Sequence, residues 1–210
     1  MLPAVALGIG VAAAAFSAST IDFSKVPAPA LQPMKGAFGI WGPIFAASIG
    51  HALVTGVSGE GGSSALFLGV SYAVCAVWAA AIRRDRYAAA SAALLAALLS
   101  AAAASATSAM GRGREHWIFE LSADLLASWL VVAFLLGLVI AGVGRLDSPQ
   151  ALVGVATATA AVAAATGKPA LCVGIGWACA MQRKASWWHA SGACLALLGA
   201  IAAFFVRFRG

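Results

Sequence analysis

The chain has 210 residues, of which 62% are hydrophobic and only 10% are charged. Soluble domains carry about 25% charged residues, so this composition excludes an ordinary soluble domain. The net charge is +6, but the basic residues lie in short clusters between apolar runs, where they suit lipid head groups better than nucleic acid. The sequence therefore predicts an all-α integral membrane protein without a nucleic-acid partner.

The apolar runs predict about eight transmembrane helices. The first run covers residues 1–21 and carries no charge, and a loop with Pro27, Pro29 and Pro33 follows it. Prolines so closely spaced favour an extended, non-helical connection. The other predicted spans cover residues 36–57, 64–82, 87–110, 119–143, 151–166, 170–181 and 187–205.

The sixth and seventh of these runs are shorter than the roughly 20 residues that a perpendicular span needs. They could be short helices or a re-entrant pair, so a count of six or seven spans stays open. With eight spans, one side of the membrane has more basic residues, and the positive-inside rule places both termini on the other, non-cytoplasmic side. The more basic side would carry Lys25, Lys35, Arg83, Arg84, Arg86, Arg145, Arg183 and Lys184, and the other Arg112, Arg114, Lys168, Arg207 and Arg209.

Small residues recur at four-residue spacing in several of the runs. This pattern lets helix backbones approach closely in lipid, so it predicts helix contacts on those faces. The stripes are Gly42, Ala46 and Gly50; Cys172, Gly176 and Ala180; and Gly192, Ala196 and Ala200.

His51 lies about midway along the second span, where ionisable side chains are rare and face a bundle interior, a cavity or a partner. One interpretation is an axial ligand to the metal of a haem or chlorophyll, or a donor to a bound polar ligand. Gly39, Pro43 and Ala47 follow one another at four-residue spacing on the same predicted face and would leave a shallow groove for a flat ring. The alternative is a neutral histidine bonded to a neighbouring helix carbonyl.

Glu120 and Asp124 lie one turn apart near the start of the fifth span. Two such carboxylates can share a proton or bind a cation. They can also lie at the membrane interface, where they complement the positive end of the helix dipole. Their position just after Trp117 favours the second interpretation.

The seven tryptophans divide into two sets. Trp117, Trp187 and Trp188 lie at span ends, as expected for an aromatic belt. The others lie within or near spans and can line a pocket for a flat apolar ligand: Trp41, Trp78, Trp129 and Trp177. The sequence contains no phosphate loop, zinc-protease or dinucleotide motif and no catalytic triad pattern, so we expect no catalytic residues and no enzyme.

Four short segments resemble one known family in the same order along the chain. Residues 38–45, FGIWGPIF, resemble the FSIWGxIY segment of the larger members of the TspO/MBR family, the tryptophan-rich sensory and translocator proteins. Residues 75–78 fall where that family shows Asn-x-x-Trp. Residues 126–133, LASWLVVA, resemble its Y-L-G-W-I-x-V-A segment, and residues 175–178 its I-W-A.

The resemblance covers residues 25–182 and implies a five-helix core over residues 36–166. Residues 1–35 would then be an N-terminal helix and loop, and residues 167–210 a C-terminal helical hairpin. It also implies binding or transport of a flat hydrophobic ligand, a tetrapyrrole (haem, porphyrin or chlorophyll) or a sterol-like molecule. The implied ligand-binding residues are Trp41, Pro43, His51, Trp78 and Trp129, with His51 as the candidate metal ligand.

The chain departs from the family pattern at pocket positions. The family asparagine is Cys75, its tyrosine is Leu126, and its Pro-Phe pair reads Ser122-Ala123. An alternative function is therefore a non-catalytic accessory subunit of a photosynthetic or respiratory membrane complex, holding chlorophyll or lipid. Expected partners are membrane lipids and either such a complex or a second copy of the chain, in a bacterial inner membrane or in an organellar one, thylakoid or mitochondrial.

Overall fold

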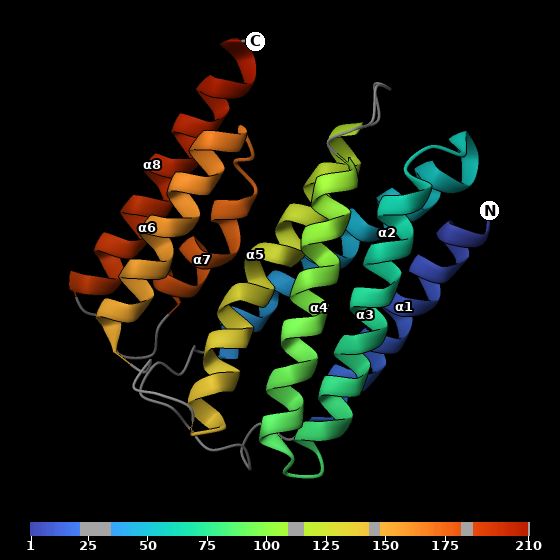
Figure 1. Ribbon diagram of the computed structural model, residues 1–210, viewed down its shortest axis with the longest axis horizontal. Helices are drawn as coiled ribbons and strands as arrows, with labels where there is room; N and C mark the ends of the chain where they lie inside the picture. The colour runs from blue at the N-terminus through green and yellow to red at the C-terminus, as the bar shows by residue number, and fades with distance from the viewer. Residues whose placement is uncertain (22–34, 109–115, 143–147, 182–186, 210) are drawn as a thin grey trace.

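The computed structural model describes residues 1–21, 35–108, 116–142, 148–181 and 187–209, and within them the fold is all-helical, as predicted (Figure 1). The predicted loop of three prolines lies outside the described residues. Eight α-helices and one short 3₁₀ helix occur in the described part: α1 (Leu2–Ser19), η1 (Lys35–Ile40), α2 (Trp41–Ser58), α3 (Gly62–Ile82), α4 (Tyr87–Ser108), α5 (His116–Ile140), α6 (Pro149–Thr166), α7 (Leu171–Ala180) and α8 (Trp187–Arg209).

Five segments of the described chain are long and apolar enough to cross a membrane. They are Phe38–Ser58, Gly62–Ile82, Tyr87–Ser108, His116–Ile140 and His189–Arg207. The helices α1, α6 and α7 are also apolar but shorter, and α7 has only 10 residues. At 1.5 Å per residue α7 rises about 15 Å, half the thickness of a hydrocarbon core. The predicted eight helices are thus confirmed, and five of them have the length of a span.

Several helix ends follow from local sequence. Gly59 ends α2 and Gly167 ends α6 in the left-handed conformation, with φ of 76° and 66°, which glycine adopts without a Cβ penalty. The Ser148 side chain accepts the backbone N–H of Ala151 and so caps the start of α6. The two glycines therefore end their helices sharply and allow short connections to the next helices.

The helices pack in two groups that α7 joins (Figure 1). In the first group, α3 packs between α1 and α4, α5 packs on α4, and α2 packs on α1 and α5. In the second group, α6 packs on α8, and α7 packs on both. The helix α7 also packs against α5 and η1. The division at residues 35 and 167 stays a prediction, and the packing groups α6 with the two helices that follow it.

Glycines allow the closest helix contacts. A Cβ on Gly10 of α1 would lie 2.7 Å from the carbonyl oxygen of Gly69 of α3, and one on Gly199 of α8 would lie 2.5 Å from the Ala160 Cβ of α6. The predicted stripe at Gly192 is confirmed, because a Cβ there would meet the Cys179 sulfur of α7 at 2.7 Å. Of the stripe of Gly42, Ala46 and Gly50, the first two residues are exposed, and only Gly50 meets another helix, with its Cβ position 3.5 Å from Ile118 of α5.

Serine hydroxyls add polar contacts between α3 and α4. Ser64 donates to the Ala104 carbonyl at 3.1 Å, Ser71 to Ala97 at 2.8 Å, and Ser100 back to Phe67 at 2.7 Å. In lipid such bonds satisfy groups that have no water to turn to. They fix the two helices that carry the centre of the first group.

Candidate functional site

Five aromatic side chains from four elements meet in the first group, and we call them the aromatic cluster: Phe38, Trp41, Phe45, Tyr72 and Trp129. They come from η1, α2, α3 and α5. Trp41 stacks on Phe45 with ring centroids 5.2 Å apart and meets Trp129 edge-on at 6.4 Å. Phe38 meets the same indole edge-on at 6.3 Å, and Phe45 lies 5.9 Å from the Tyr72 ring. Edge-on and offset contacts are the favourable geometries for aromatic pairs.

Trp129 carries an unused hydrogen-bond donor in this cluster. Its side chain is only 3% exposed, and its indole Nε1 has no hydrogen-bond partner among the described residues. An indole N–H can only donate, and a buried donor without an acceptor costs about 1–3 kcal/mol. Trp41 beside it is partly exposed. The cluster therefore combines a flat aromatic surface that reaches the outside with a buried donor that a bound acceptor would satisfy.

The predicted ligand residues are only partly brought together. Trp41 and Trp129 are in contact with each other. Trp78 is partly buried against the hydrophobic core of the first group, but it makes none of the ring contacts that define the aromatic cluster. Pro43 lies in the first turn of α2, where proline is compatible with a regular helix, and it is exposed. His51 is buried, so it does not share an exposed groove with Pro43.

His51 is completely buried farther along α2, and both of its ring nitrogens have partners. Nδ1 lies 2.7 Å from the Ser122 hydroxyl of α5, and Nε2 lies 3.5 Å from the Gly61 carbonyl. The Ser122 hydroxyl also lies 3.0 Å from the Phe119 carbonyl, and it has only one hydrogen to donate. With the ring proton on Nε2, the ring donates to Gly61 and Ser122 donates to Nδ1. With the proton on Nδ1, the ring donates to Ser122, which donates to Phe119. This arrangement matches the alternative of a histidine bonded to a neighbouring carbonyl, and a metal ligand would have to displace one of these bonds.

The ring of Phe119 packs against the imidazole of His51. The two ring centroids are 4.6 Å apart, and the same phenyl ring lies under Gly61, where a Cβ would come within 2.8 Å of it. Gly61 has φ of 70°, a conformation that favours glycine on its own account. The α2–α3 turn is thus fitted onto α5 by one histidine and one phenylalanine.

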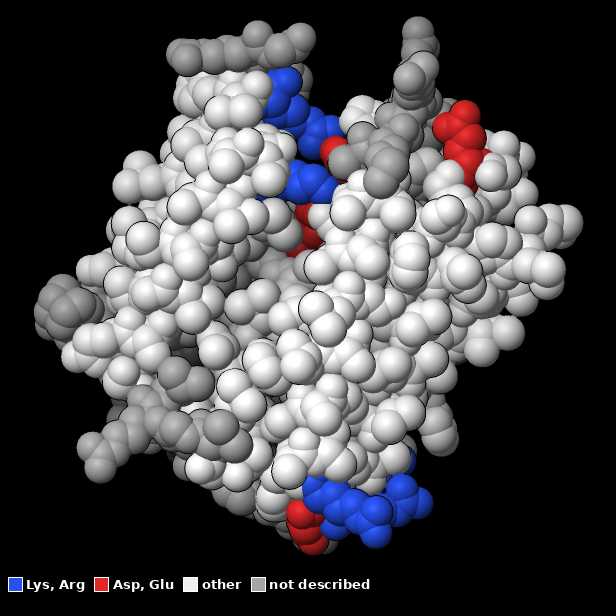
Figure 2. All heavy atoms as spheres, in the orientation of Figure 1, with Lys and Arg blue, Asp and Glu red and all other residues white. Residues whose placement is uncertain are grey.

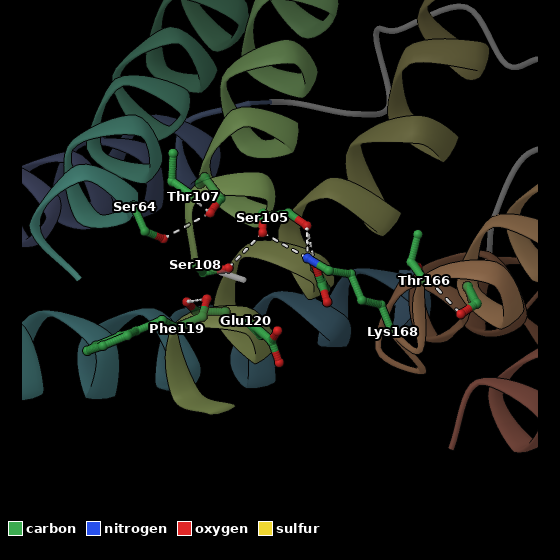
Figure 3. A network of polar contacts seen from close by, with 12 residues as sticks. Ser64, Ser105, Thr107, Ser108, Phe119, Glu120, Thr166 and Lys168 are labelled. Atoms are coloured by element: carbon green, nitrogen blue, oxygen red, sulfur yellow. Dashed lines mark hydrogen bonds and ion pairs between the residues drawn. The ribbon is translucent and has the colours of Figure 1, made fainter. Parts of the chain in front are cut away.

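A second polar site connects the two helix groups. Asp124 of α5 accepts a 2.5 Å hydrogen bond from Ser105 of α4. The Lys168 amine, in the turn before α7, lies 2.7 Å from the same hydroxyl, 2.8 Å from the Ser105 carbonyl and 3.5 Å from Asp124 Oδ1. Figure 3 shows the Lys168 side chain extending from its turn toward Ser105. Asp124 is 2% exposed, so this ion pair is buried.

One turn earlier on α5, Glu120 forms a second ion pair between the groups, with Arg207 of α8. Its Oε2 lies 2.7 Å from the Arg207 guanidinium, which also lies 3.3 Å from His116 Nε2. Acidic and basic side chains meet in a hollow between the helix groups, toward the end where the C-terminus lies (Figure 2). Each acid is buried near the start of α5 and is paired with a base from the second group, a partner that the sequence did not predict.

A third feature is an apolar groove between α1 and α2. Its lining is almost entirely apolar and contains none of the predicted ligand residues. The lining residues are Met1, Ala4, Val5, Gly8, Val11, Ser48, Ile49, Ala52, Leu53 and Gly56.

The fold and these sites define a helical integral membrane protein with a buried aromatic cluster and a buried charged junction. A family model described as TSPO-like protein matches residues 4–166, from α1 to the end of α6. The chain therefore belongs to the TSPO-like protein family, as its motifs predict, and α7 and α8 lie beyond the matched residues. Comparisons with curated proteins and with solved structures find no match.

Proposed function

We propose that this chain binds a flat hydrophobic ligand, a tetrapyrrole or a sterol-like molecule, at the aromatic cluster. The observation that carries the proposal is the buried Trp129 indole, whose Nε1 has no partner among the described residues, in contact with the partly exposed Trp41. Ligand sites are mostly apolar and aromatic, with a few polar groups that fix orientation. A planar ligand that stacks on Trp41 and presents an acceptor to Trp129 fits both properties.

The departures from the family pattern indicate which contacts would bind the ligand. Cys75 and Leu126 are buried in the apolar core, and Ser122 is bonded to His51. These positions therefore offer few polar groups to a ligand. Affinity would come from aromatic contact and shape, with one N–H for orientation, which supports binding or transport and not catalysis.

The direct test is a titration of the purified protein with protoporphyrin IX, followed by the ligand's absorption shift. Trp41→Ala should weaken binding about tenfold, the equivalent of about 1.4 kcal/mol. Trp117→Ala is the matched control, because that tryptophan is 55% exposed at the start of α5, away from the cluster, and should leave the affinity unchanged. Absence of saturable binding, or equal binding by the Trp41→Ala variant, would contradict the proposal for tetrapyrroles.

A competition experiment separates the two ligand classes. A radiolabelled sterol bound to the same cluster should be displaced by protoporphyrin IX and should lose affinity in the Trp41→Ala variant. Trp129→Phe keeps a ring in the cluster but removes the N–H donor. It should weaken a ligand that offers an acceptor to Trp129 more than one that is wholly apolar. Sterol binding unaffected by Trp41→Ala would assign the sterol to another surface.

A further inference from the structure

The second helix group meets the first through few elements. In the described chain, α7 is the helix of this group that packs substantially on the first group, against α5 and η1. Two ion pairs between described side chains also connect the groups, and we call their four side chains the charge clasp: Glu120, Asp124, Lys168 and Arg207. One short helix and one set of charges thus hold the two groups together.

The clasp is assembled at one end of the molecule by local geometry. Glu120 and Asp124 are one turn apart on α5, so their side chains project in similar directions. Gly167 ends α6 in the left-handed conformation and lies against Arg207, because a Cβ added to this glycine would lie 3.5 Å from the Arg207 backbone nitrogen. Lys168 follows directly. One tight turn therefore brings both basic residues to the two acids.

The same turn leads into α7, which lies directly beside the aromatic cluster. The Gly174 N–H of α7 donates to the Ser128 hydroxyl of α5 at 2.7 Å. A Cβ on Gly174 would lie 2.6 Å from the backbone nitrogen of Trp129, so the two backbones are in direct contact at that residue. Any movement of α7 away from α5 would uncover the helix face next to Trp129.

We propose that the charge clasp holds α7 against α5 and so sets the position of the wall beside Trp129. Lys168 and Asp124 are then positioning residues for the ligand site, and this part of the inference rests on the proposed function. The physical reason is that a buried charge is costly unless it is paired. Separation of the groups would take Lys168 and Arg207 away from their acidic partners and leave Asp124 with the Ser105 hydroxyl alone, so the paired state keeps α7 in place.

Amide hydrogen exchange of the full chain in detergent tests the clasp without any ligand. In Lys168→Met, exchange over residues 169–180 should accelerate about tenfold, because Gly174 loses its bond to Ser128, while exchange over α3 should not change. Lys168→Arg keeps the charge and should restore slow exchange. Arg83→Met is the matched control: its guanidinium bonds to Ser17 and Thr20 at the other end of the bundle, and its loss should not affect α7.

The ligand arm uses protoporphyrin IX with the same variants. Lys168→Met should weaken binding about tenfold and Lys168→Arg should restore it. Unchanged exchange over α7 in Lys168→Met would overturn the clasp. Faster exchange with unchanged affinity would overturn the positioning role at the ligand site. Absence of protoporphyrin IX binding by the unaltered chain would refute the proposed function for tetrapyrroles, and exchange alone would then decide on the clasp.

Discussion

At the scale of single residues, the α2–α3 turn shows how several constraints meet at one glycine. Gly59 and Gly61 both have positive φ, but their surroundings differ. A Cβ on Gly59 would meet open space, whereas one on Gly61 would enter the ring of Phe119, next to His51. The two positions therefore separate backbone strain from packing.

Gly61→Ala should destabilise the protein more than Gly59→Ala. Both alanines pay about 1–2 kcal/mol for a left-handed backbone, and at residue 61 a clash with Phe119 adds about 1–3 kcal/mol. Thermal unfolding in detergent, followed by circular dichroism, measures the difference. Equal losses in the two variants would show that Phe119 moves aside without cost.

At the residue scale, the sequence indicated which helix carries each side chain but did not indicate the partners of the two acids. Trp41 and Trp129, which lie in two of the family motifs, are in contact in the structure. The partners of Glu120 and Asp124 come from residues about 90 and 45 positions later, a separation that no local pattern encodes. The available signal was a charge balance: two acids at the start of a span and bases at the ends of later helices.

At the scale of helices, the bounds were predictable because apolar runs and glycine turns are local. The grouping was not, since every predicted span is apolar on most sides and offers no single face that selects a neighbour. The glycine contacts make that selection. Gly10 and Gly69 fit α1 to α3, and Gly199 fits α8 to α6.

Gly10→Ala should loosen α1 from α3, with a loss of about 1–3 kcal/mol from the clash with the Gly69 carbonyl. Gly8→Ala is the control on the same helix, because nothing lies within 4 Å of its Cβ position. That variant should be neutral or stabilised by up to about 1 kcal/mol, since alanine favours the helix. Thermal unfolding compares the two, and a Gly10→Ala variant as stable as Gly8→Ala would rule out this contact as a determinant of α1 packing.

At the scale of the whole molecule, the two ends differ in how many of their basic side chains are paired with acids. Arg83, Arg84 and Arg86 are exposed at the α3–α4 turn, in the blue group at the lower end of Figure 2. At the other end, Lys168 and Arg207 are engaged with acids inside the protein. Free positive charge at the described ends therefore favours the α3–α4 turn as the cytoplasmic side.

Cysteine labelling in a cysteine-free variant tests this orientation. Asp85 and Glu60 are exposed in the turns at opposite ends of α3. A membrane-impermeant maleimide added to intact cells should label Glu60→Cys and should label Asp85→Cys only after the membrane is opened. The reverse pattern would invert the predicted topology.

The ligand site at the aromatic cluster is tested most directly by photocrosslinking. A porphyrin or sterol probe with a diazirine group, irradiated with the purified protein and mapped by mass spectrometry, reports which residues touch it. We expect adducts on peptides that contain Trp41 or Trp129, lost on competition with unlabelled ligand. Competed adducts confined to the α1–α2 groove or to the exposed face of α8 would contradict a ligand site at the aromatic cluster.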